Sequence, residues 1–254
     1  MILSNLFASL LQLIFKPKIW FPLIGMLIIS TATTAAMSIL LQGLILDVTI
    51  YSNILELQPV FSVFLTQYFL EIIFAIILAF LMTVLGVISF MSTSRIAQGE
   101  KLVKAINKSM NEYQKAFGIA LIFWGTFIFV IFLGMILSII AGFNELIAIA
   151  LLTILLIVFT VVFVKVVFAL PALNKNELKE AIKSSWKFTN NKFWNSIIYL
   201  LLIGVILVIL GSIFYQIELL LEGNVIELIV LALFETFPSL FFISAITNYF
   251  YSKQ

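Results

Sequence analysis

Six long apolar runs divide the sequence, at about residues 19–42, 64–92, 116–140, 146–170, 194–215 and 227–250. A transmembrane helix needs about 20 apolar residues to cross a hydrocarbon core of about 30 Å, so each run is long enough to span a membrane. The whole chain is 63% hydrophobic and 10% charged, against about 45–50% and about 25% in soluble domains. These features predict an all-α membrane protein, with six transmembrane helices in one domain over residues 1–254.

The basic residues outside the apolar runs all fall in alternate connections, which predicts the topology. Thirteen Lys and Arg residues lie before run 1, between runs 2 and 3, between runs 4 and 5, and after run 6, whereas the other three connections have none. Positively charged loops stay in the cytoplasm. We therefore expect a multi-pass protein of the cell (cytoplasmic) membrane with both termini in the cytoplasm.

The missing residue types exclude most enzyme chemistry. The chain has no cysteine, no histidine and a single aspartate, Asp47. A Cys/His zinc site, a His-based triad and a catalytic aspartate pair cannot be built from this set. We expect a non-enzymatic protein with no metal, no cofactor and no nucleic-acid partner.

Two of the basic connections resemble each other at a constant offset of 76 residues. Leu102, Ala105, Ile106, Ser109 and Phe117 recur as Leu178, Ala181, Ile182, Ser185 and Phe193. In both segments the apolar positions follow the spacing of one helix face and lysines occupy the remainder, with Met110 aligned with Trp186. Such a helix carries too many charges to span, so we expect it to lie in the membrane interface with its apolar face towards the bilayer.

The N-terminus forms a weaker third copy. Leu3, Leu6, Leu10 and Ile14 give an apolar stripe, and KPKIW (residues 16–20) parallels NKFW (residues 191–194). The predicted architecture is three parallel repeats, at about 1–92, 93–170 and 171–254, each an interfacial amphipathic helix followed by a two-helix hairpin.

Three segments carry a family resemblance: SRIAQGEKLVKAINKSM (94–110), LPALNKNELKEAIKSSWKFTNNKFW (170–194) and FPSLFFISAITNYFYSK (237–253). They resemble a broad family of six-helix bacterial and archaeal membrane proteins. This family includes the membrane domain fused to some glycerophosphodiester phosphodiesterases. The resemblance implies a six-span fold and transfers no catalytic residue, because phosphodiesterase chemistry belongs to a separate soluble domain rich in Glu, Asp and His.

The lysines of the two similar segments are candidate contacts for lipid headgroups or for a protein partner. Clustered lysines beside a bilayer attract anionic headgroups, although the same charges could serve only to set topology. The candidates are Lys101, Lys104, Lys108, Lys115, Lys175, Lys179, Lys183, Lys187 and Lys192.

Three ionisable residues lie within the apolar runs and are candidate intramembrane sites. Glu235 lies about eight residues into run 6, before Pro238, and is either a functional site or a protonated group hydrogen-bonded within the bundle. Glu71 is deep only if its helix begins near Pro59, and lies at the outer interface if the helix begins near Tyr68. Lys165 either extends to the cytoplasmic headgroups or pairs with one of the two glutamates.

Glycines recur along two of the apolar runs. Gly118, Gly125 and Gly134 lie in run 3, and Gly204 and Gly211 in run 5. Small residues allow close helix packing in membranes, and we expect packing within the chain rather than dimerisation.

These observations favour an accessory or membrane-organising protein. Its basic cytoplasmic helices would bind anionic membrane lipids or a partner in a membrane-protein complex. The alternative is a transporter or permease-like subunit with a polar path at Glu235.

Overall fold

The computed structural model describes residues 2–40, 42, 68–141, 145–221 and 225–252. Side chains are described over the same ranges except at 40, 138–141, 145, 148, 218–221 and 225–235. The regular elements in these ranges are all helices, in agreement with the predicted all-α class.

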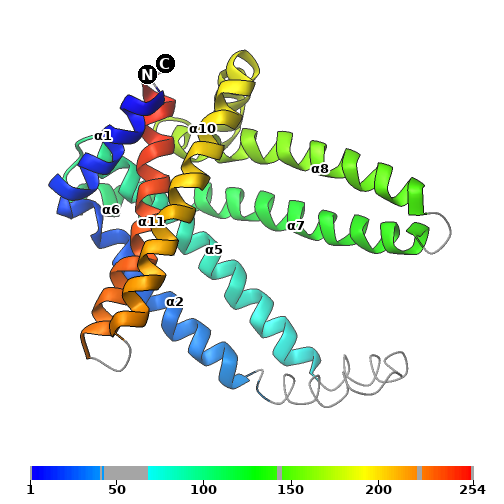
Figure 1. Ribbon diagram of the computed structural model, residues 1–254, viewed down its shortest axis with the longest axis horizontal. Helices are drawn as coiled ribbons and strands as arrows, with labels where there is room; N and C mark the ends of the chain where they lie inside the picture. Colours follow the sequence, from blue (N-terminus) through cyan, green and yellow to red (C-terminus); the bar gives the residue numbers. More distant parts are fainter. Residues whose placement is uncertain (1, 41, 43–67, 142–144, 222–224, 253–254) are drawn as a thin grey trace.

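Three pairs of long helices form hairpins that diverge from one end of the molecule (Figure 1). The pairs are α2 (Phe21–Leu40) with α5 (Phe69–Ala97), α7 (Tyr113–Ala141) with α8 (Glu145–Val167), and α10 (Leu178–Leu221) with α11 (Val225–Tyr251).

Shorter elements gather where the hairpins meet. They are α1 (Ile2–Phe15), the 3₁₀ turn η1 (Pro17–Ile19), α6 (Leu102–Asn111) and α9 (Ala169–Ala172). The two chain ends lie side by side at this end of the molecule (Figure 1), where the Asn5 side-chain amide donates a 2.8 Å hydrogen bond to Ser252 Oγ.

Five helical segments within the described residues are long and apolar enough to cross a membrane. They include α5, which has 29 residues and begins at Phe69, after Tyr68. The sixth predicted span lies in α11, part of which is outside the described side chains, so the count of six stays a prediction. The threefold repeat also stays a prediction.

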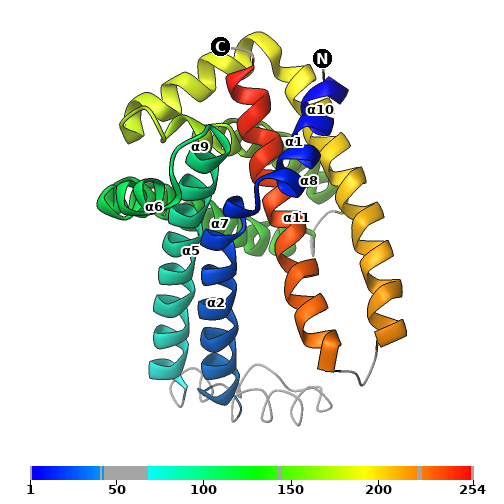
Figure 2. The same ribbon diagram turned by 90° about the vertical axis from the view of Figure 1, so that its left-hand side faces the viewer.

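The first half of α10 crosses the end where the hairpins meet, and the helix then turns towards α11 (Figure 2). The turn lies at Lys192, whose φ of −140° and ψ of 31° depart from helical values. The segment that the sequence sets apart as an interfacial helix is thus separated from the following span by a kink at Lys192.

The buried side chains concentrate where the hairpins meet. We call this region the base: residues 87–97 of α5, residues 164–174 around α9 and residues 240–251 of α11, with α1, α6 and the first half of α10. Aromatic rings fill its centre, where Phe168 lies 5.3 Å from Phe188 and 5.8 Å from Tyr249, measured between ring centroids. Tyr249 also stacks on Tyr199 at 4.1 Å.

The predicted orientation of the amphipathic helices is wrong at their central positions. Ala105 and Ala181 are fully buried, and so are Ser109 and Ser185. These small residues face the neighbouring helices and not the bilayer, because their size lets α6 and α10 pack closely against the base.

Only one of the five glycines noted in the sequence has a close neighbour. A Cβ atom at Gly118 would clash with the side chain of Leu178, whereas a Cβ at Gly125, Gly134, Gly204 or Gly211 would meet nothing within 4 Å. The expectation of packing within the chain therefore holds at Gly118 and is wrong for the other four.

Candidate functional site

A buried arginine, Arg95, organises the charged part of the base. It lies near the end of α5 and its side chain is 1% exposed. Nη1 donates to Ser109 Oγ at 2.8 Å, and Nη2 donates to Glu112 Oε2 at 2.6 Å. Burying a charge is costly unless it is paired, and these two contacts offset the cost of burying the Arg95 guanidinium.

The turn after α5 brings these partners together. Glu100 N–H donates to Arg95 O, and Gly99 N–H donates to Ile96 O, which is the Schellman arrangement that ends a helix. Gly99 has a φ of +100°, a conformation that side chains disfavour. The chain therefore reverses directly into α6, whose Ser109 then faces Arg95.

The ion pairs continue from Arg95 to α10. Lys115 Nζ lies 3.2 Å from Glu112 Oε2 and 3.2 Å from Glu177 Oε1. Burial raises the pKa of Glu112, but the hydrogen bonds and charges of Arg95 and Lys115 outweigh it and hold the pKa below its ordinary value. Glu112 is therefore ionised at neutral pH and joins the end of α5, the start of α7 and the segment before α10.

A second, uncharged network starts at the neighbouring Ser94. Its Oγ lies 2.9 Å from Thr247 Oγ1 of α11 and accepts a 2.7 Å hydrogen bond from the Asn174 side-chain amide. Tyr251 OH donates to Pro171 O at 2.8 Å. These bonds fasten α11 to α5 and to the segment around α9.

The predicted headgroup lysines fall into two groups. Lys115 is held by two glutamates and is 12% exposed, and Lys192 is half-buried, with Nζ 5.4 Å from the Phe188 ring centre. The other seven are exposed, and we call them the lysine face: Lys101, Lys104, Lys108, Lys175, Lys179, Lys183 and Lys187.

The predicted intramembrane residues lie apart. Glu71 is in the first turn of α5, at the end of the hairpin far from the base. Lys165 is near the end of α8, where its Nζ donates to Asn190 Oδ1 at 3.0 Å and lies 3.8 Å from the Trp186 ring centre. The side chain of Glu235 lies outside the described residues.

Sequence reasoning missed Arg95 and Glu112 as a pair. The sequence places Arg95 among the loop charges, because the second apolar run ends at about residue 92, whereas α5 continues to Ala97. The signal available was the glycine four residues after Arg95, which marks the helix end.

Comparison with known proteins supports a family relation. The family model described as the membrane domain of glycerophosphoryl diester phosphodiesterase matches residues 136–253. These residues, which make up less than half of the chain, are similar to this membrane domain. The match includes two of the three segments that carry the resemblance, 170–194 and 237–253, but not the segment 94–110 that contains Arg95. No curated protein and no solved structure gives a match.

Proposed function

We propose that this protein is a non-enzymatic component of the cytoplasmic membrane that binds anionic lipid through the lysine face. The observation that carries the proposal is the exposure of all seven lysines in and just before α6 and α10. Arg95 and Lys115, by contrast, are already neutralised by glutamates inside the base. Within the lysine face, Lys108 Nζ lies 3.8 Å from Glu100 Oε1 and Lys175 Nζ lies 4.5 Å from the Tyr251 ring centre, and the other five lysines carry the charge left available to a partner.

The lysine face suits a charged membrane surface better than a small ligand. Its lysines lie in and just before α6 and α10, and Lys115 at the start of α7 pairs with Glu177 just before α10. Each Lys near an anionic surface contributes about 1 kcal/mol of attraction. Several exposed charges acting together therefore give strong binding that weakens as salt rises.

The base belongs on the cytoplasmic side in this proposal. The lysines lie in the connections that the distribution of charge assigns to the cytoplasm. The adjacent termini fit the same assignment, because a chain whose two ends share one side crosses the membrane an even number of times.

The transporter alternative has less support. It requires a polar path to Glu235. The described cavity that includes Pro238 lies among α2, α5, α10 and α11, and every residue that lines it is apolar except Ser239. This observation favours an apolar surface beside Pro238 over a path for a polar substrate.

The experiment compares two variants of the full-length protein. Lys175, Lys179, Lys183 and Lys187 are changed together to Gln, and in the matched control to Arg, which keeps the charge. Each protein is equilibrated in mixed micelles with equal phosphatidylglycerol and phosphatidylcholine, and the bound lipids are quantified at low and high salt.

We expect phosphatidylglycerol to be enriched on the wild type and on the Arg variant at low salt, and to be released at high salt. The Gln variant should lose most of this enrichment. Equal enrichment on the Gln variant would reject the lysine face as the lipid site. A different result would identify a protein partner instead. In that case the wild type shows no preference between the two lipids, and a protein copurifies with the wild type and the Arg variant but not with the Gln variant.

A further inference from the structure

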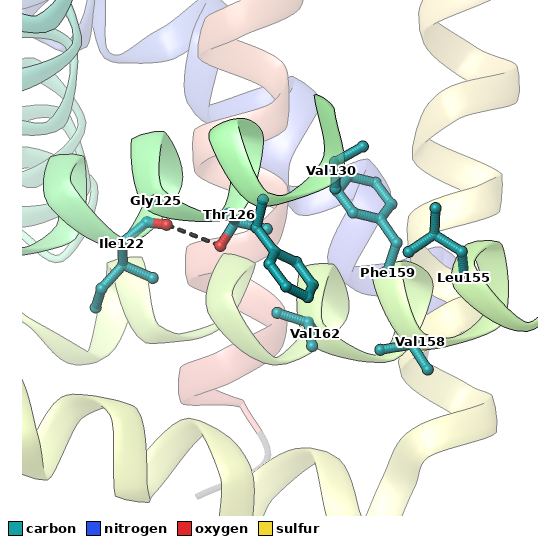
Figure 3. Close-up of a pocket in the computed structure, with 9 residues that line it drawn as sticks. Ile122, Gly125, Thr126, Val130, Leu155, Val158, Phe159 and Val162 are labelled. Carbon is teal, nitrogen blue, oxygen red and sulfur yellow. Dashed lines mark hydrogen bonds between the residues drawn. The ribbon is translucent and has the colours of Figure 1, made fainter. Parts of the chain in front are cut away.

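The hairpin of α7 and α8 leaves an apolar groove along one side (Figure 3). It consists of two cavities of about 390 and 410 Å³ that share Phe129, Leu155 and Val158. On α7 the lining runs from Ile122 to Leu137, a length of about 22 Å at 1.5 Å per residue. We call this feature the hairpin groove.

A glycine leaves space in the cavity of the groove that lies nearer the base. Gly125 lines the groove, and a Cβ atom there would meet nothing within 4 Å. The only hydroxyl in the lining, on Thr126, donates to Ile122 O of its own helix at 2.8 Å. The Thr126 hydroxyl therefore donates its hydrogen within the helix, and the groove offers an apolar surface.

A lysine lies in line with the groove at the end nearer the base. Lys165 follows Val162 by three residues and Val158 by seven, so it is on the same side of α8 about one turn beyond the lining. Its Nζ contacts the Asn190 amide oxygen and the Trp186 ring. Among the described residues no carboxylate forms an ion pair with Lys165.

The size of the groove limits what can occupy it. The two cavities, of about 390 and 410 Å³, follow one line between α7 and α8, which suits a narrow and elongated occupant. A single hydrocarbon chain is narrow enough, and a groove within a membrane-spanning hairpin lies where such chains are the solvent.

We propose that the hairpin groove holds one acyl chain of an anionic phospholipid, whose phosphate binds Lys165. The positive charge of Lys165 lies at the end of the groove nearer the base, and apolar residues line the remainder. A phospholipid has the same arrangement, with a charged headgroup at one end and an apolar chain behind it. This site goes beyond the lysine face and does not depend on it. The acyl chain is held by contacts that salt does not screen.

The test uses two glycine substitutions on the same helix. Gly125→Leu fills the groove, whereas Gly134→Leu adds the same side chain at another open position of α7 that does not line it. Replacing a helical glycine favours helix formation, so both variants should fold. Lys165→Gln and Lys165→Arg test the charge separately.

The measurement is native mass spectrometry of the full-length protein after detergent exchange at high salt. We expect the wild type, Gly134→Leu and Lys165→Arg to retain one phospholipid per chain. Gly125→Leu should lose at least tenfold in occupancy, and Lys165→Gln should lose the preference for phosphatidylglycerol over phosphatidylcholine.

Retention by Gly125→Leu equal to that of wild type would overturn the proposal, and so would a wild type without bound lipid. A lipid-free dimer that Gly125→Leu converts to a monomer would overturn it in favour of a second copy. The fourfold Lys→Gln variant of the lysine face separates the two proposals, because it should keep the lipid of the groove while losing salt-sensitive lipid.

Discussion

The base and the far ends of the hairpins differ in what covers their side chains. In the base, residues 89–97 and 167–174 are buried without interruption. At the hairpin ends, which we define as residues 28–39, 69–81, 127–137, 146–159 and 205–215, Ala75 is the only buried side chain among those described. The same apolar composition is thus packed against protein at one end and left open at the other.

The difference follows from the solvent that each region meets. Within a bilayer, lipid tails cover apolar side chains as well as protein does, so the hydrophobic effect does not drive helices together. Near the aqueous interface, burying apolar side chains and forming polar contacts within the protein again stabilise the fold. The base holds the molecule together by its own contacts, and the hairpin ends rely on lipid.

The largest expected difference between the two regions comes from removing one phenylalanine ring from each. Phe168→Ala in the base, where the side chain is fully buried, should cost about 3–5 kcal/mol of unfolding free energy. Phe132→Ala at a hairpin end, where the side chain is 60% exposed, should change stability by less than about 0.5 kcal/mol. Thermal unfolding followed by loss of monodisperse protein measures both.

The next largest effect comes from the buried ion pair. Glu112→Gln leaves Arg95 without its charged partner and should cost about 3 kcal/mol, the low end for a broken buried pair. Glu100→Gln is the matched control, since Glu100 and Lys108 are 3.8 Å apart and both partly exposed, and should cost under about 1 kcal/mol. Equal losses in the two variants would show that Arg95 does not depend on Glu112.

A smaller effect is expected from enlarging a residue at a helix contact. Ala181→Leu places a longer side chain where α10 packs on the base and should cost about 1–3 kcal/mol by overpacking. Ala35→Leu, at an exposed position of α2, adds the same atoms without a neighbour to displace. If Ala181→Leu unfolds at the temperature of wild type, the tight contact inferred from burial is wrong.

The smallest effect is a dependence on pH. The pKa of Glu112 is lower in the folded protein than its ordinary value. Its ion pair therefore stabilises the fold above the ordinary pKa, and this contribution is lost as pH falls through the folded value. We expect the unfolding temperature to drop as pH falls below the ordinary pKa of 4.5 and through the lower folded pKa, and this part of the drop should be absent from Glu112→Gln.

Sequence periodicity predicted the helices well because long apolar runs and their charged boundaries are local signals. The spacing of the apolar positions predicted one bilayer-facing side of each short helix, but Ala105 and Ala181 are buried whereas Met110 and Trp186 are exposed. It could not tell whether lipid or protein covers that face, because apolar and small residues suit both. Burial resolves this point, and shows the small residues turned towards the protein.

The charged network depended on information that periodicity does not contain. Arg95 and Glu112 are 17 residues apart and meet only because Gly99 reverses the chain. The lysines, in contrast, were found from sequence, because exposed charge needs no partner within the chain. Two of the nine, Lys115 and Lys192, proved to be packed against the base, since glutamates and an aromatic ring lie beside them.

The most direct test of the account is the side of the membrane on which each region lies. The chain has no cysteine, so single substitutions can be labelled cleanly. Lys183→Cys reports on the lysine face of the base, and Leu146→Cys reports on a hairpin end, where Leu146 is 79% exposed. The probe is a membrane-impermeant maleimide applied to inside-out and right-side-out vesicles. We predict that Lys183→Cys reacts only in inside-out vesicles and Leu146→Cys only in right-side-out vesicles, whereas reaction of both in the same vesicles would contradict the account.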